Sequence, residues 1–416
     1  MKKLLLGVSL ASIFVLVAAA AVAKGNGSAA SRPEGFIFDG GRLTVKPYVA
    51  LSYSYDSNVD TASKSANDSY FSINPGADFM WHGDRWALTG GLWYRYNSYL
   101  DYHNTLSENS VGENLGYRWS NISEEGRGWN VLLDERYALM SQNDDINSSD
   151  GRGVWRDREK IDLSGVLERQ FTDRLHGSVM GQYNWLDYKN DTGKYAPLYG
   201  WSQRAVGVQG GWVAGAYSVL LISAGYNDYT QHKGSGYHDY STDSHSWNLQ
   251  GGIGTRATEN ITYRAMMGIS QLSYGGHNNA DMGWTYQLSA NWRVARTVSI
   301  SLMGNSYYQP SERSLGQAMK VYSLSGGVSY LTLGDRVNLT ANISYRLDET
   351  VWNDRYLAHG SDYDETILSF SLGASYTINR WVSINSNFTW EENWCENHDD
   401  YNYDRFRFSV GMRFHY

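Results

Sequence analysis

Hydrophobic and polar residues alternate along most of the chain from residue 42 onward. The clearest example is residues 403–416, where polar residues or glycine separate a regular series of apolar ones. The apolar positions of this segment are Phe406, Phe408, Val410, Met412, Phe414 and Tyr416. Because successive side chains of a strand point to opposite faces, this pattern predicts a strand with one apolar and one polar face. A lipid bilayer covers such an apolar face, so we expect the segment to span a membrane.

The same alternation recurs as a series of hairpins. Short turns are expected at residues 82–85, 121–128, 172–174, 214–215, 257–260, 294–296, 333–336 and 378–380. Longer polar connections are expected at residues 56–68, 101–110, 141–158, 189–198, 230–243, 275–282, 310–318, 348–363 and 391–402. The count is about 18 strands, with about 16 as the alternative, each of roughly 10 to 13 residues, which suffices to cross a bilayer at a tilt. The sequence therefore predicts an all-β fold, a transmembrane antiparallel up-and-down β-barrel over residues 42–416 with short periplasmic turns and long extracellular loops.

Aromatic residues gather where the predicted strands end, as in the interfacial girdles of membrane barrels. Those beside short turns are Trp81, Trp86, Trp119, Trp129, Trp292 and Trp381. Those beside long connections are Tyr55, Tyr96, Trp185, Tyr226, Tyr274, Tyr308 and Trp390. The hairpin repeat of roughly 45 residues also suits a propeller blade, but a blade needs four short strands in that length and the pattern here gives two long ones.

Composition agrees with a strand-forming chain, with 33 Tyr, 16 Trp and 43 Gly but only 5 Pro. Mean hydropathy is low, at -0.50. On its own this value indicates a soluble secreted protein, but alternating membrane strands also average to a polar value. Two places depart from the pattern. Glu135 falls on an apolar face, which predicts a bulge or a register shift there, and residues 216–226 are apolar on both faces.

The first residues indicate export. Lys2 and Lys3 precede an apolar run that ends in small residues, so residues 1–23 are predicted to be a signal peptide, with an uncleaved membrane anchor as the alternative. Residues 24–41 are short and polar and are predicted to be a flexible periplasmic lead-in. The single cysteine, Cys395, excludes an intrachain disulfide framework. We expect the mature chain to cross the periplasm and reside in the outer membrane of a Gram-negative cell.

The polar faces of the predicted strands give the expected pore lining, which is more basic than acidic. Its basic members are Lys46, Arg95, Arg118, Arg136, Arg264, Arg293, Arg346, Arg405, Arg407 and Arg413. Its acidic members are Asp78, Asp134, Asp162, Glu168 and Glu391. Many Asn, Gln, Ser and Thr residues lie between them. Guanidinium and amide groups bind carboxylates and sugar hydroxyls, so the pattern predicts a lumen that favours anionic solutes or saccharides. Alternatively, these arginines pair with neighbouring carboxylates and only support the wall.

Other chemistry is weakly represented. Ten histidines occur, mostly beside Gly or Asp in expected loops, and none belongs to a nucleophile motif, so we predict no enzyme and no catalytic residues. The basic residues are spread around the wall rather than along one strip, which predicts no nucleic-acid partner. Acidic residues gather in two expected loops and suit either solvent or divalent ions that bridge to lipopolysaccharide. They are Asp144, Asp145, Asp150, Glu396, Asp399 and Asp400. Their spacing matches no ordered metal-binding loop, so we predict no metal site and no cofactor.

Residues 47–59 read Pro-Tyr-Val-Ala-Leu-Ser-Tyr-Ser-Tyr-Asp-Ser-Asn-Val. This segment resembles the beta-barrel porin 2 family of outer-membrane proteins, whose first strand runs into an aromatic-Asp-x-Asn-Val element. Members are often associated with exopolysaccharide or capsule production, so the resemblance implies polymer passage across the outer membrane. Asp56 and Asn58 are expected to shape the exit from the strand rather than to contact a substrate.

The sequence thus predicts an outer-membrane channel for a saccharide or exopolysaccharide. A general diffusion porin, a barrel hydrolase and a structural or adhesive barrel are the alternatives. The expected partners are outer-membrane lipid and lipopolysaccharide, periplasmic chaperones, the barrel-assembly machinery and a saccharide solute or polymer. The aromatic-ended residues 403–416 are expected to carry the membrane-insertion signal.

Overall fold

The computed structural model describes residues 35–58, 67–100, 107–122, 127–144, 154–188, 200–215, 218–231, 243–255, 260–274, 280–310, 318–333, 336–351, 364–396 and 402–416. The predicted signal peptide, residues 1–23, lies outside these ranges, as do the acidic loop residues Asp145, Asp150, Asp399 and Asp400.

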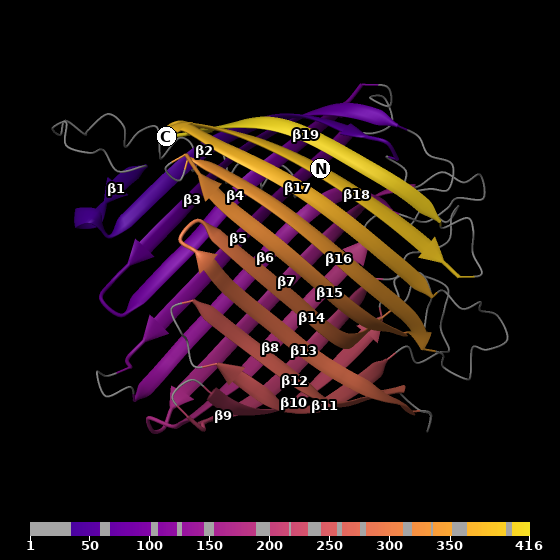
Figure 1. Ribbon diagram of the computed structural model, residues 1–416. Coiled ribbons are helices and arrows are strands. Elements are labelled where there is room, and N and C mark those ends of the chain that lie inside the picture. The colour runs from indigo at the N-terminus through magenta and orange to yellow at the C-terminus, as the bar shows by residue number, and fades with distance from the viewer. Residues whose placement is uncertain are drawn as a thin grey trace.

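The molecule is a closed antiparallel barrel of tilted strands (Figure 1). The barrel strands are β2 (Leu43–Asp56), β3 (Asp68–His82), β4 (Trp86–Tyr99), β5 (Ser107–Ser120), β6 (Gly128–Asp144), β7 (Val154–Gln170), β8 (Leu175–Tyr188), β9 (Trp201–Val213), β10 (Ser218–Gln231), β11 (Ser244–Thr255), β12 (Ile261–Tyr274), β13 (Ala280–Ala295), β14 (Val298–Pro310), β15 (Ala318–Thr332), β16 (Val337–Val351), β17 (Glu365–Asn379), β18 (Val382–Cys395) and β19 (Tyr403–His415). Neighbours in sequence are neighbours in the wall, and β19 pairs with β2 to close it. The prediction of an up-and-down barrel of 18 strands, β2 to β19, is confirmed.

A short strand precedes the barrel. It is β1 (Phe36–Phe38), which the 3-10 turn η2 (Asp39–Gly41) joins to β2. β1 pairs with the first residues of β2, and the ring of Phe36 stacks on that of Tyr416 at a centroid distance of 4.6 Å. Residues 36–38, the last part of the expected lead-in, thus pair with the wall, and Phe36 gains an aromatic contact there.

The alternation of the sequence becomes two faces of the wall. We call the face that carries the exposed hydrophobic side chains the outer face and the opposite one the inner face. Phe71 is 55% exposed and Ile222 is 60% exposed on the outer face, an arrangement suited to lipid. The register also orients β10, whose sequence is apolar on both sides. Leu220 and Ile222 are outward, whereas Val219 is buried at 7% exposure.

The strand ends that short turns join and those that long connections join lie at opposite ends of the barrel, which we call the turn end and the loop end. Strand lengths run from 12 residues in β11 to 17 in β6 and β7. The expected length of roughly 10 to 13 residues was too short for most strands. In the β6–β7 hairpin, pairing continues to Asp144 and Val154, within a segment expected to be loop. Polar strand ends of this kind give no alternation signal, although their backbone still pairs.

Glu135 is accommodated without the expected irregularity. The register of β6 runs unbroken on both sides, and Glu135 lies opposite Leu115 of β5 and Leu163 of β7. The predicted bulge is therefore wrong, and the carboxylate shares the outer face with Leu133, which is 50% exposed. Replacement of Glu135 by leucine is expected to stabilise the barrel in lipid, because a charged group on a lipid-facing position is costly. Urea unfolding in phospholipid vesicles measures this gain, and an unchanged or lower midpoint contradicts it.

Aromatic side chains mark the turn end as predicted. The rings of Trp81 and Trp86 meet edge to face at 5.2 Å, and Trp381 lies 5.8 Å from Tyr416. The loop end differs in part from the expectation. Tyr226 is 45% exposed and Tyr96 37% exposed on the outer face, but Tyr274 and Tyr308, expected in the same girdle, are buried at 4% and 3%.

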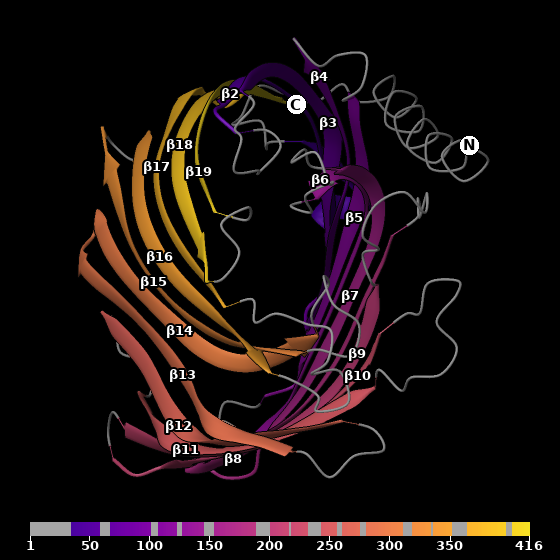
Figure 2. The ribbon, with the colours of Figure 1, turned by 90° about the vertical axis from the view of Figure 1, so that its right-hand side faces the viewer.

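The cause is a local departure of β14 from the wall. The pairing of β13 with β14 extends from the turn end only to Gln287 and Asn305, whereas β14 pairs with β15 up to Pro310. Figure 2, which looks toward the loop end, shows β13 and β14 diverging there. The end of β14 instead approaches β10, which is four strands away.

Candidate functional site

The candidate functional site is the inner face of the barrel. On one side it carries a hydrogen-bonded ladder of amides over four neighbouring strands, β8 to β11. Asn184 donates to Gln203 at 2.8 Å, and Gln203 donates to Asn227 at 3.2 Å. Gln182 adds a donor to Asn184 at one end, and Asn227 donates to the Ser246 hydroxyl at the other. Linked amides of this type polarise one another and hold a fixed pattern of donors and acceptors.

On the other side, strands β14 to β17 form a shallow hollow rich in hydroxyls. Its volume is about 320 Å³. Its polar lining consists of Ser301, Ser325, Asn342, Ser344, Ser369 and Ser371. Ser344 and Ser369 are hydrogen-bonded to each other at 2.6 Å, and Asn342 donates to Ser371 at 3.4 Å. Hydroxyls both donate and accept, so this surface can exchange hydrogen bonds with water or with sugar hydroxyls.

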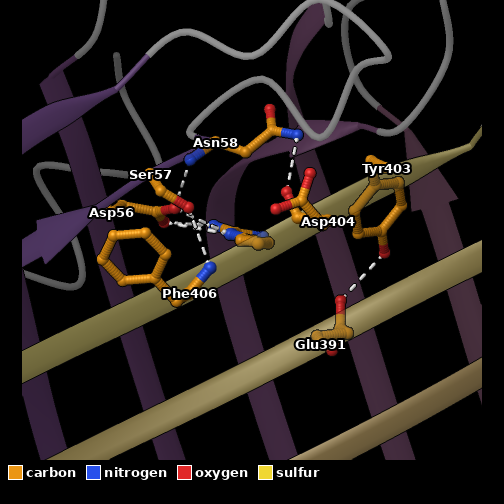
Figure 3. A network of polar contacts seen from close by, with 8 residues as sticks. Asp56, Ser57, Asn58, Glu391, Tyr403, Asp404 and Phe406 are labelled. Carbon is orange, nitrogen blue, oxygen red and sulfur yellow. Dashed lines mark hydrogen bonds and ion pairs between the residues drawn. The ribbon is translucent and has the colours of Figure 1, made fainter.

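The ion pair between Arg405 and Asp56 joins β19 to the end of β2. Arg405 Nε lies 2.9 and 3.1 Å from the two carboxylate oxygens of Asp56, and Arg405 Nη2 also binds one of them. Asp56 additionally accepts the main-chain N–H of Asn58 at 3.1 Å. Ser57 accepts the main-chain N–H of Phe406 at 2.8 Å (Figure 3). These contacts show that the Asp-x-Asn element fixes the exit of β2 beside the closing strand.

Three further predicted residues also meet partners on the inner face. Arg346 binds Asp348 with two bonds of 2.7 and 2.6 Å. Arg413 contacts Asp78 at 3.3 Å, and its guanidinium carbon lies 3.7 Å from the ring centroid of Tyr48. Arg413 thus joins β19 to β3, whereas Arg346 and Asp348 belong to the same strand, β16. The third, Arg264, donates to Gln209 and to the sulfur of Met266.

The remaining predicted residues occupy inner-face positions of the register. Lys46 lies opposite Asp78, Arg136 opposite Asp162 and Asn114, and Arg407 opposite Asp56 and Thr389. Arg95 lies over the ring of Trp93 at 5.6 Å. The solvent-exposed members are Arg95, Arg118, Arg136, Arg293 and Arg407, together with Lys46. They are distributed around the wall rather than gathered in one pocket.

Sequence reasoning missed Lys320, a buried basic residue of the interior. Lys320 of β15 shares its strand face with Leu324, which is 45% exposed to the outside, yet Lys320 itself is only 2% exposed. Its amine donates to Ser270 of β12 at 2.6 Å and lies 3.8 Å from the ring centroid of Tyr308. Alternation assigns Lys320 to the outer face, so no local signal identifies this contact.

The described residues hold no group of three or more side chains placed to bind a metal ion. Within the same ranges, no helix is long and apolar enough to cross a membrane.

A closed barrel with an apolar outer face and a polar inner face defines a transmembrane β-barrel. No family model matches the chain, and no curated protein matches it either. Among solved structures, it is similar to the outer membrane protein opdK from Pseudomonas aeruginosa, with a TM-score of 0.43 and 12% identity over 92% of this chain and 100% of that one. It is also similar to the copper transporter OprC, with a TM-score of 0.44 and 10% identity over 92% and 82% of the two chains. A bacterial polysaccharide outer membrane secretin gives a TM-score of 0.34 and 11% identity over 89% and 98%.

Proposed function

We propose that the chain forms a channel through the outer membrane of a Gram-negative cell for a saccharide or exopolysaccharide. The observation that carries this proposal is the lining of the inner face, where the amide ladder of β8 to β11 faces the same interior as the serine-rich hollow of β14 to β17. A carbohydrate exchanges hydrogen bonds with such a lining as readily as water does. The resemblance of residues 47–59 to the beta-barrel porin 2 family supports the same substrate class.

We also propose that the lumen favours anionic solutes. Arg346, Arg405 and Arg413 already hold carboxylates, so they contribute little to a passing anion. The exposed basic residues of the inner face are the ones assigned to the pore, and Arg118, Arg136, Arg293 and Arg407 are chosen to test this assignment. A single charge about 4 Å from an ion in water changes its energy by about 1 kcal/mol, which is a factor of about five in local concentration.

The proposed route to the membrane uses the periplasmic chaperones and the barrel-assembly machinery. Residues Phe406, Phe408, Val410, Met412, Phe414 and Tyr416 are proposed as the insertion signal. They occupy alternate positions along β19 and the residue after it, on the outer face, so they offer an apolar face to the assembly machinery before lipid covers them. Lipopolysaccharide is the proposed neighbour of the loop end. The proposal includes no enzymatic step.

The charge assignment is tested by replacing Arg118, Arg136, Arg293 and Arg407 with glutamine. We expect the anion-to-cation permeability ratio to fall by roughly fivefold or more, since about 1 kcal/mol is lost for each nearby charge. Block by an acidic oligosaccharide is expected to weaken, while block by a neutral one stays unchanged. Reversal potentials in planar bilayers under a salt gradient measure both effects.

A matched control removes four arginines from the turn end. Arg85, Arg174, Arg296 and Arg380 are exposed there, so their replacement by glutamine changes the net charge equally. We expect this variant to keep the permeability ratio and the block of the parent chain. Equal effects of the two variants would contradict a pore assignment for the inner-face arginines. Lack of block by either saccharide would contradict a saccharide substrate.

A further inference from the structure

At the loop end, β14 is held inside the barrel by a side-chain contact with β13 and by a contact with β10, which is not its neighbour. Tyr308 is 3% exposed, and its hydroxyl donates to the Asp281 carboxylate of β13 at 2.8 Å. Its main-chain oxygen accepts a hydrogen bond from the hydroxyl of Tyr229 on β10. β14 therefore crosses the inner faces of β13, β12 and β11 to reach β10.

β15 and β16 follow β14 inward. The amine of Lys320 reaches Ser270, on the inner face of β12, at 2.6 Å. At the end of β16, the main-chain oxygen of Val351 accepts the hydroxyl of Tyr274 at 2.7 Å. The side chain of Tyr308 also packs with Leu272, Tyr274 and Ala318 in a small buried cluster. This part of the wall thus forms a second layer inside β10 to β13.

The end of β14 could also continue its pairing with β13 in the wall. Continuing the register beyond Gln287 and Asn305 would place Trp284 opposite Tyr308 and Gly283 opposite Gln309. Trp284 is 70% exposed on the outer face, and Tyr308 shares its strand face with the exposed Leu302. In that register both aromatic rings would join the outer girdle at the loop end, where alternation predicts Tyr308. Two aromatic residues at a membrane interface are favourably placed.

We propose that the parts of β14, β15 and β16 at the loop end form a gate for the proposed channel. In the observed state they lie inside the barrel and narrow its loop end, and the β13–β14 ladder stops at Gln287 and Asn305. In the second state they return to the wall, complete that ladder and widen the passage. The movement gives up inner contacts such as that of Lys320 with Ser270 and gains ladder hydrogen bonds between β13 and β14. The gate rests on the proposed channel function.

A disulfide that forms only in the second state tests the gate. We choose Gly283→Cys with Gln309→Cys in a Cys395→Ser chain, because directly opposite residues in an antiparallel pair lie within disulfide reach. A Cβ at Gly283 finds only ordinary contacts, the nearest being the Tyr308 hydroxyl at 3.6 Å. The control pair is Ser289→Cys with Met303→Cys, which are already opposite each other in the ladder.

We expect both pairs to form disulfides on oxidation of the folded protein in bilayers. The Gly283/Gln309 pair should also raise the single-channel conductance, reversibly on reduction, whereas the control pair should not. A Lys320→Gln change should speed the first crosslink and leave the second unchanged, because it removes a contact of the inner state only.

Two results would overturn the gate. One is a control pair that crosslinks while the Gly283/Gln309 pair stays reduced. The other is a conducting chain whose conductance is the same with the Gly283/Gln309 disulfide closed or open. Crosslinking of both pairs in a chain that never conducts would support the strand movement and overturn the proposed channel function instead.

Discussion

Replacing Asp56 by alanine is expected to lower the free energy of unfolding of the barrel by about 3–5 kcal/mol, because it leaves a largely buried guanidinium without its carboxylate. Asp56 is 2% exposed and accepts bonds from Arg405 and from the main chain of Asn58. The pair also joins β19 to β2, the two strands that close the ring. Urea unfolding of the refolded chain in phospholipid vesicles measures the loss.

The control for this prediction is a more exposed ion pair between a lysine and an aspartate of one strand, β7. Lys160 and Asp162 lie 3.1 Å apart with side chains 41% and 32% exposed. Replacement of Asp162 by alanine is expected to cost less than about 1 kcal/mol, as for other solvent-exposed pairs. A double Asp56→Ala/Arg405→Leu variant should recover part of the loss, since no unpaired charge remains. A loss for Asp56→Ala no larger than for Asp162→Ala would contradict a structural role of the closing pair.

Replacing Gly268 by alanine is expected to destabilise the barrel by about 3 kcal/mol or more, the upper end of the cost of overpacking. Gly268 lies on the inner face of β12, opposite Gln250, where a Cβ would overlap the main-chain oxygen of Leu249. That oxygen belongs to the neighbouring strand and cannot move aside as a flexible side chain can. The β11–β12 ladder would have to shift, two residues from the contact of Ser270 with Lys320.

Gly251 of β11 offers the matched control for this glycine. A Cβ there has its nearest neighbour at 3.9 Å, the main-chain oxygen of Leu221. Replacement by alanine is therefore expected to stabilise the strand by roughly 0.5–1 kcal/mol, because glycine has the larger conformational entropy when unfolded. Opposite signs for the two variants in the urea experiment support the close approach at Gly268. Destabilisations of equal size would contradict it.

The strands and their order are predictable because the bilayer imposes a local rule. Residues 403–416 show the alternation without interruption, and β19 has the faces that it predicts. The short turns are equally visible, because the alternation of one strand ends and that of the next begins at residues 82–85 and again at residues 378–380. The Asp-x-Asn element was expected to shape the exit of β2, and the bonds of Asp56 and Asn58 show how it does so.

The interior is less predictable, because its partners are distant in sequence. Alternation assigns Arg405 to the polar face but does not reveal that Asp56, 349 residues away, holds it. Tyr308 and Lys320 show this more strongly. Alternation assigns each of them to one face of its strand, but the loop ends of both strands leave the wall, so neither side chain reaches the outside. The choice between an outer girdle and an inner layer depends on packing against β10 and β12, which a periodic pattern does not contain.

The most direct test of the account is the ion conductance of the refolded mature chain in a planar bilayer. We expect discrete open steps, a reversal potential of the sign set by anion preference, and block by an added acidic oligosaccharide. Heat-modifiable, correctly folded protein that inserts and yet gives no steps, with or without the Gly283/Gln309 disulfide, would contradict the channel.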